Sequence, residues 1–326
     1  MKTKAPRNKT IELSSREEAG YAAKALKLKS PARFEQVVDQ IIWQDSLKAM
    51  DLLPDRCVDL LIADPPYNLT KNFGQTTFKE RDFDEYKTWL DGWLKKTVRL
   101  LKPNASVYIC SDWKTSLVIP EIAGRYFLLQ NRISWEREKG RGALNNWKNC
   151  LEDIWFFTVG KDYTFNLDAV KIQRPVLAPY RDASGRPKDW SENGAERIRL
   201  THPSNIWTDI SIPFWSMPEN TNHPTQKPEK LIAKLILASS NSGDVVFDPF
   251  LGSGTTAVTA KKLGRRFIGI EREKEYAALA LRRLELAETN PAIQGYENGC
   301  FKLRPYYSNI PAGKIRQGYQ RARILN

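Results

Sequence analysis

The four residues Asp64-Pro65-Pro66-Tyr67 directly follow a mainly apolar run at 58–63, and they could act on a planar amino group. Such an amine is a poor nucleophile, because its lone pair is delocalised into the ring. A carboxylate such as that of Asp64 accepts a hydrogen bond from the amine and stabilises the positive charge that develops on nitrogen. The Pro65 carbonyl can be a second acceptor, since two consecutive prolines fix its direction. Tyr67 offers a flat face on which a base can stack.

A second string, Asp248-Pro249-Phe250-Leu251-Gly252-Ser253-Gly254-Thr255-Thr256, reads as the end of a strand, a glycine turn and the start of a helix. Gly252 and Gly254 let the backbone turn tightly and approach a ligand closely. Glu271 ends the next apolar strand, and its distance of about 20 residues from the glycines fits a residue that binds ribose hydroxyls. Ala257 stands where a dinucleotide fingerprint has glycine or alanine, so this string alone leaves NAD open as the cofactor.

Together the two strings resemble those of DNA amino-methyltransferases that use S-adenosylmethionine. The motif at 64–67 matches the catalytic motif of that family, and 248–254 matches its cofactor motif. The permuted order, with the catalytic motif first, is that of the β class. Two further strings agree with the family, Trp43-Gln44-Asp45-Ser46 and Asn222-His223-Pro224-Thr225-Gln226-Lys227-Pro228. The resemblance covers residues 37–288.

The resemblance implies a Rossmann-like α/β methyltransferase fold, with a mostly parallel seven-stranded sheet and helices on both faces. It implies S-adenosyl-L-methionine as the cofactor and double-stranded DNA as the substrate, with the target base flipped out of the duplex. The catalytic residues would be Asp64, Pro65, Pro66 and Tyr67. The cofactor would be held by Asp45, Thr225, Lys227, Asp248, Phe250, Gly252, Ser253, Gly254, Thr255 and Glu271.

Aspartate at position 64 favours the 6-amino group of adenine, because family members that methylate the 4-amino group of cytosine favour serine there. Cytosine-N4 methylation remains the nearest alternative. Relatives that methylate RNA or a protein amide usually have asparagine at this position, and a non-catalytic nucleic-acid binder would not need an intact motif. The chain contains no Pro-Cys pair, which argues against methylation of cytosine carbon 5.

The charge of the chain agrees with a polyanionic partner: 326 residues carry a net charge of +13, with an isoelectric point near 9.5. Four scattered cysteines and two histidines indicate neither a disulfide framework nor a metal site. We expect a cytoplasmic protein, since no apolar stretch is long enough to span a membrane and the N-terminus lacks a signal-peptide core. A cognate restriction endonuclease and a second copy of the chain are further expected partners.

The chain divides into five predicted segments: a basic arm at 1–36, a catalytic half at 37–135, a target-recognition insertion at 136–220 with a core strand near 151–159, a cofactor half at 221–288 and a basic extension at 289–326. The insertion loses regular periodicity and is rich in proline and tryptophan. The alternative is that its aromatic residues only form a small satellite core.

Four basic residues near the start of the insertion are the predicted DNA contacts, namely Arg137, Lys139, Arg141 and Lys148. Among the helices, we expect one over 15–28 in the arm and an amphipathic one over 84–101, followed by a strand at 105–110.

Overall fold

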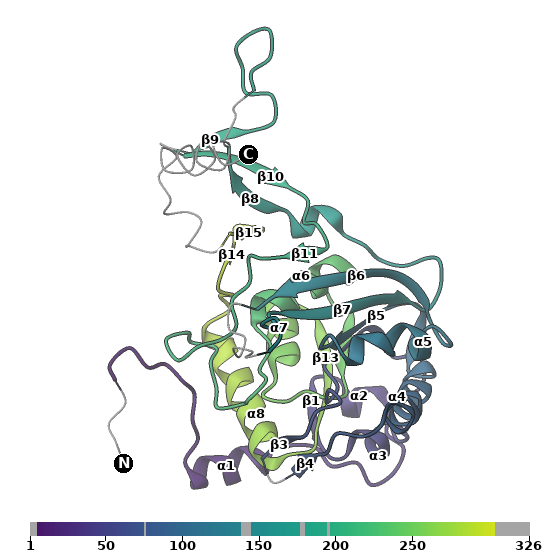
Figure 1. The fold of residues 1–326 in the computed structure, drawn as a ribbon. Helices are drawn as coiled ribbons and strands as arrows, with labels where there is room; N and C mark the ends of the chain where they lie inside the picture. Colours follow the sequence, from purple (N-terminus) through teal and green to yellow (C-terminus); the bar gives the residue numbers. More distant parts are fainter. Residues whose placement is uncertain (1–4, 75, 138–144, 177–179, 194–195, 304–326) are drawn as a thin grey trace.

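The structure is a computed structural model that describes residues 5–303 except for 75, 138–144, 177–179 and 194–195 (Figure 1). Lys139 and Arg141, two of the predicted DNA contacts, lie outside the described residues. The same is true of the C-terminal extension from residue 304 onward.

The main sheet has eight strands in the order β1-β13-β12-β2-β5-β7-β6-β11. Strand β7 is antiparallel to both of its neighbours, and all the other neighbouring pairs are parallel. The mostly parallel α/β sheet is therefore confirmed, and the two-residue β11 adds one strand to the seven that we expected. The strands are β1 (Gln40–Trp43), β2 (Val58–Ala63), β5 (Leu101–Ser111), β6 (Leu128–Glu136), β7 (Leu151–Thr158), β11 (Ile206–Trp207), β12 (Val245–Asp248) and β13 (Arg266–Glu271).

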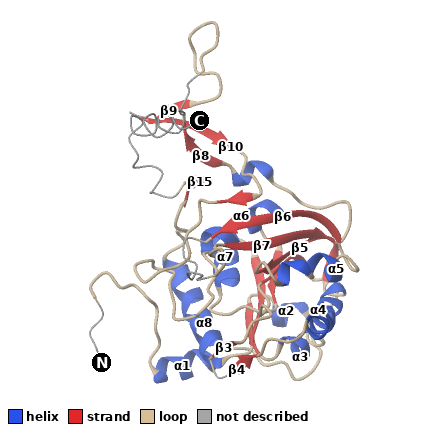
Figure 2. Cartoon of the chain, viewed as in Figure 1, coloured by secondary structure: helices blue, strands red, loops and turns tan. Residues whose placement is uncertain are grey.

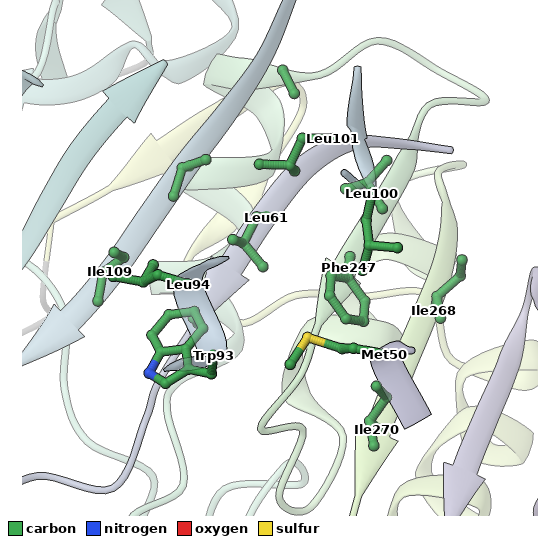
Figure 3. Packing of buried hydrophobic residues seen from close by; sticks show 14 of the residues in the cluster. Met50, Leu61, Trp93, Leu94, Leu100, Leu101, Ile109, Phe247, Ile268 and Ile270 are labelled. Carbon is green, nitrogen blue, oxygen red and sulfur yellow. The ribbon is translucent and has the colours of Figure 1, made fainter. Parts of the chain in front are cut away.

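Helices cover both faces of this sheet, as Figure 2 shows. Residues of the central strands alternate between the two resulting core layers, which is why their sequences read as continuous apolar runs. Leu61 and Phe247 belong to the layer that contains Met50 and Trp93 (Figure 3), whereas Leu60 belongs to the opposite layer. The first layer is covered by α2 (Phe34–Val37), α3 (Ser46–Met50), α4 (Phe83–Val98) and α5 (Ile119–Ala123), and the second by α6 (Glu229–Ser239), α7 (Thr255–Lys262) and α8 (Lys274–Thr289).

The boundary between α4 and β5 differs from the sequence-based prediction. The helix ends at Val98, and β5 begins at Leu101, so the Lys102-Pro103-Asn104 segment belongs to the strand. Proline can enter a strand where the ladder of hydrogen bonds is interrupted. The register between β2 and β5 shifts at this point, because Val58 pairs with Leu101 while Leu60 pairs with Ser106.

The N-terminal arm packs against the main domain. Its helix α1 (Ser15–Ala22) is shorter than predicted, and the Tyr21 hydroxyl donates a hydrogen bond of 2.8 Å to Glu285 of α8. A capping box between Ser14 and Glu17 begins the helix.

A second, smaller sheet extends away from the main one (Figure 1) and has the strand order β14-β15-β8-β10-β9. We expected irregular structure in this part of the chain. The strands escaped prediction because two of them come from the distant segment 296–302. Phe301 of β15 is fully buried with Val170 and Ala233, so the described part of the C-terminal extension packs on the domain. The remaining elements are β8 (Ile172–Pro175), β9 (Ser191–Asn193), β10 (Glu196–Thr201), β14 (Tyr296–Glu297), β15 (Cys300–Lys302), the hairpin β3 (Lys71–Phe73) and β4 (Thr76–Phe78), and the 3-10 turns η1 (Thr115–Leu117) and η2 (Leu167–Val170).

Candidate active site

The two sequence motifs meet at one edge of the main sheet. Asp64 directly follows β2, Asp248 ends the neighbouring parallel strand β12, and Glu271 ends β13. The carboxyl ends of parallel strands share an edge, and open α/β sheets bind their ligands there. Residues far apart in the sequence therefore face the same region of the molecule.

Asp64 lies in a cluster of charged side chains. Its Oδ2 is 2.6 Å from Lys227 Nζ, and its Oδ1 is 2.9 Å from the Tyr67 hydroxyl. The same hydroxyl is 3.0 Å from Glu152 Oε2 and 3.2 Å from Lys227 Nζ. The other oxygen of Glu152, Oε1, is 2.7 Å from Arg137 Nη1. Two carboxylates and two cations thus surround one tyrosine hydroxyl.

Glu152 was not predicted from the sequence, because it lies at the start of a strand. Since β7 is antiparallel, its first residues reach the same edge as the carboxyl ends of the parallel strands. Arg137 directly follows β6 and arrives beside it. An acid inside the apolar run at 151–158 was the only signal in the sequence. Lys227, which we predicted to hold the cofactor, contacts Asp64 instead, and its role toward the cofactor stays a prediction.

The charges of the cluster depend on one another. Burial raises the pKa of the Asp64 carboxyl, and the Lys227 ammonium opposes that shift. Burial alone would lower the pKa of Lys227, but the carboxylates of Asp64 and Glu152 raise it above the usual lysine value. Lys227 therefore remains protonated at neutral pH.

The catalytic motif is held from below by a helix. The hydroxyl of Tyr86, a fully buried residue of α4, donates a hydrogen bond of 3.1 Å to the Pro66 carbonyl. Pro65 is buried between Asp64 and Pro66, and its role as a second acceptor stays a prediction.

The glycine turn after β12 requires glycine at two positions. Gly252 and Gly254 have φ angles of +56° and +89°, in the left-handed region that other residues rarely adopt. A Cβ on Gly252 would lie 2.9 Å from Nε2 of His223, and one on Gly254 would lie 2.6 Å from the Cβ of Ala280 in α8. The backbone is therefore packed closely between a helix and a side chain of the 222–228 segment.

Asp248 and Glu271 hold this turn through backbone hydrogen bonds. Asp248 accepts from the Phe250 amide at 2.9 Å, and Glu271 accepts from the amides of Gly252 at 2.7 Å and Glu273 at 2.6 Å. A carboxylate has about four acceptor sites, so Glu271 retains capacity for a further donor. Its predicted contact with ribose hydroxyls stays a prediction.

A cavity of about 650 Å³ connects the glycine turn with the catalytic motif. This volume lies within the range of small-molecule sites, roughly 300–1,000 Å³. The predicted residues that line it are Asp45, Asp64, Pro66, Tyr67, Thr225, Phe250, Gly252 and Glu271. Trp89 and Trp93 also line it and were not predicted, because they lie within α4 and read as core residues. Ser253, Gly254 and Thr255 are buried beneath the turn.

A family model described as DNA methylase, of the N6/N4 methyltransferase group, matches residues 58–282. The chain belongs to this N6/N4 DNA methylase family. The type II methyltransferase M.HpaI of Haemophilus parainfluenzae is 36% identical over 251 residues, which are 76% of this chain and 74% of that protein. The DNA adenine methyltransferase YhdJ of Escherichia coli is 36% identical over 264 residues, which are 79% of this chain and 86% of that protein.

Solved structures of the N6/N4 DNA methylases agree with the fold. The cytosine-N4-specific PvuII DNA methyltransferase aligns with a TM-score of 0.56 at 19% identity, covering 86% of this chain and 91% of that one. TTHA0409 of Thermus thermophilus, a DNA modification methylase crystallised with S-adenosyl-L-methionine, aligns with a TM-score of 0.50 at 21% identity, covering 81% of this chain and 97% of that one.

The structure places two of the four DNA-contact candidates of this DNA methylase. Lys148 is exposed in the connection between β6 and β7, beside Trp147, which is 94% exposed. Arg137 lines the cavity and pairs with Glu152, so its guanidinium is already engaged by a carboxylate. A DNA contact by either residue stays a prediction.

Within the described part of the chain, no group of three or more His, Cys, Asp or Glu side chains is arranged to hold a metal ion. Nor does any helix there combine the length and apolar character needed to cross a membrane.

Glu271 is expected to make the ligand-free DNA methylase less stable as pH rises. Burial raises the pKa of this carboxyl to about 8. A carboxyl whose pKa is higher in the folded than in the unfolded protein stabilises the fold fully below its unfolded pKa and loses that contribution as pH rises through the folded value. Between pH 5 and 8, Glu271→Gln should therefore gain on the order of 1–4 kcal/mol in unfolding free energy relative to wild type, since one pKa unit corresponds to about 1.4 kcal/mol.

Urea unfolding of both proteins at several pH values measures this difference. Glu288→Gln, which removes an exposed carboxylate of α8 paired with Lys261, is the control and should keep the wild-type dependence on pH. A difference between Glu271→Gln and wild type that stays constant from pH 5 to 8 would contradict the prediction.

Proposed function

We propose that this DNA methylase transfers the methyl group of S-adenosyl-L-methionine to the 6-amino group of adenine in double-stranded DNA. The observation that carries the proposal is the single cavity that joins the glycine turn at Gly252 with the carboxylate of Asp64. One end of it suits an adenosine-containing cofactor, and the other presents an acceptor and an aromatic ring to a base.

The residues of the cavity fit the proposed cofactor. The left-handed turn at Gly252 brings backbone close to the ligand, and Phe250 and Trp89 offer apolar faces at the same end. Glu271 and Asp45 supply carboxylate oxygens for hydroxyl or ammonium groups. When bound, the cofactor would supply an electrophilic methyl group on a sulfonium centre.

The chain's own residues would then bind and orient the base. A base inside a duplex cannot reach Asp64, so it must leave the stack at a cost of a few kcal/mol. Stacking on Tyr67 recovers part of that cost. Asp64 accepts a hydrogen bond from the amine and stabilises the charge that develops on its nitrogen.

Two arguments support adenine over cytosine. Position 64 is aspartate, the residue that the family resemblance associates with adenine. YhdJ, which covers most of this chain, is described as an adenine methyltransferase. The PvuII enzyme has the same fold and is described as specific for cytosine-N4, so the fold itself does not decide between the two bases.

Methyl transfer from radiolabelled S-adenosyl-L-methionine to DNA prepared from a methylation-deficient bacterium tests the proposal. After digestion to nucleosides, we expect the label in N6-methyladenosine. Label in N4-methylcytidine would correct the base, and absence of label from DNA would overturn the proposal. Sequencing of the product would give the recognition site and so the short duplex needed for kinetic work.

A further inference from the structure

The hydroxyl of Tyr67 lies between two carboxylates at nearly equal distances, 2.9 Å from Asp64 Oδ1 and 3.0 Å from Glu152 Oε2. A tyrosine hydroxyl carries one proton, so it donates to only one of them at a time. Lys227 Nζ, at 3.2 Å, donates to a lone pair of the same hydroxyl. The Tyr67 proton therefore has two acceptors within reach.

One of these acceptors is needed elsewhere during the proposed reaction. Asp64 must accept a hydrogen bond from the target amine, but its Oδ2 is engaged by Lys227 at 2.6 Å and its Oδ1 by Tyr67. The amine can take full advantage of Oδ1 only when Tyr67 no longer donates to it. Leaving a buried hydroxyl without an acceptor would oppose that exchange.

Glu152 is held in place to receive the hydroxyl. Its side chain is only 6% exposed, and its Oε1 is fixed by Arg137 at 2.7 Å. Its Oε2 also lies 3.3 Å from Lys227 Nζ. Its backbone is paired with Trp135 in the register of β6 and β7, so it sits on a strand and not on a loop. The Tyr67 hydroxyl can therefore change acceptor without a movement of its ring.

We propose that Glu152 is a positioning residue that accepts the hydrogen bond of the Tyr67 hydroxyl when the target amine replaces that hydroxyl on Asp64. The exchange moves hydrogen bonds only, and no covalent bond to hydrogen is broken. Arg137 and Lys227 balance the two carboxylates, which keeps both of them ionised while the exchange takes place. The inference rests on the proposed function, because the amine is that of the proposed substrate.

A double-mutant cycle between Glu152 and Tyr67 tests the inference. Glu152→Met is similar in size to glutamate and lacks a strong acceptor, while Tyr67→Phe keeps the ring and removes the hydroxyl. In the wild-type background, we expect Glu152→Met to slow single-turnover methyl transfer about 10- to 100-fold, the effect of one hydrogen bond to a charged group. In the Tyr67→Phe background the same change should slow transfer less than about threefold, since no hydroxyl remains to be accommodated.

Two further variants separate this role from a structural one. Glu152→Gln keeps a carbonyl oxygen at the same place and should recover part of the rate that Glu152→Met loses. Asp153→Ala removes the next carboxylate of β7, which contacts Ser116 and Ser134 and not Tyr67. It should change the rate by the same factor with or without the tyrosine hydroxyl. Cofactor affinity, measured by calorimetry, should stay within about twofold of wild type for Glu152→Met and Glu152→Gln.

An equal loss for Glu152→Met in both tyrosine backgrounds would overturn the inference and leave the proposed function standing. Absence of methyl transfer by the wild-type protein would overturn both. If Glu152→Met did not fold, the cycle would be completed with Glu152→Gln, for which we expect a smaller loss with the same dependence on the Tyr67 hydroxyl. A loss without that dependence would again overturn the inference.

Discussion

Replacing Asp64 by alanine is expected to slow methyl transfer to DNA by about three orders of magnitude, the upper range for loss of one preorganised contact to developing charge. The carboxylate is the acceptor placed for the target amine at one end of the cavity. Its removal also leaves Lys227 beside Glu152 alone, so that the positive charge of the ammonium acts against the charge developing on nitrogen. Single-turnover transfer from radiolabelled cofactor, followed by nucleoside analysis, measures the loss.

The cofactor should still bind to the Asp64→Ala variant, because the glycine turn and Glu271 lie at the other end of the cavity. Asp64→Asn keeps the shape of the side chain, removes its charge and should also lose most of the activity. Asp59→Ala is a matched control, since Asp59 is a carboxylate of the same strand that pairs with Lys102 at 2.8 Å and does not line the cavity. Near-normal turnover by Asp64→Ala would exclude the proposed role of this residue.

The position of the site could be predicted from the sequence because both motifs follow buried strands. The apolar runs at 58–63 and 245–247 became neighbouring parallel strands, as their composition indicated. Once two strands are parallel neighbours, the residues after their carboxyl ends must lie at the same edge. Local sequence was therefore sufficient to bring Asp64 and the glycine turn together.

The partners of Asp64 could not be predicted in the same way. Glu152 reaches the site only because β7 runs antiparallel to the other strands of the main sheet, and strand direction is a property of the tertiary fold. Lys227 belongs to a predicted motif, but nothing in its spacing shows which end of the cavity its side chain reaches. Arg137 looked like a DNA contact because it is a cation in a basic stretch, whereas its ion pair with Glu152 depends on the pairing of β6 with β7.

The small second sheet and the start of β5 also depend on distant residues. Strand β8 pairs with β15, which comes from the other side of the cofactor half in the sequence, so no local periodicity could indicate it. Pro103 ended the predicted helix 84–101 correctly in principle, but the strand begins before the proline, because the register of β2 and β5 is interrupted there.

Replacing Gly252 by valine is expected to weaken binding of S-adenosyl-L-methionine about tenfold or more. A residue with a β-carbon pays roughly 1–2 kcal/mol to adopt the left-handed conformation of Gly252, and about 1.4 kcal/mol corresponds to a factor of ten in affinity. The new Cβ would also lie 2.9 Å from His223 Nε2, so either the turn or the histidine must move. Both residues line the cavity, and movement of either changes the shape offered to the cofactor. Calorimetric titration with the cofactor measures the affinity.

Backbone strain by itself could also lower affinity by destabilising the whole protein, and Gly243→Val separates the two effects. Gly243 has a φ angle of +84°, and a Cβ there meets nothing within 4 Å. It precedes β12, at the opposite end of that strand from the glycine turn. Both variants should therefore unfold at lower temperature, while only Gly252→Val should lose cofactor affinity, and both should bind DNA nearly as the wild type does. Equal cofactor affinities for the two variants would mean that the turn at Gly252 does not shape the cofactor site.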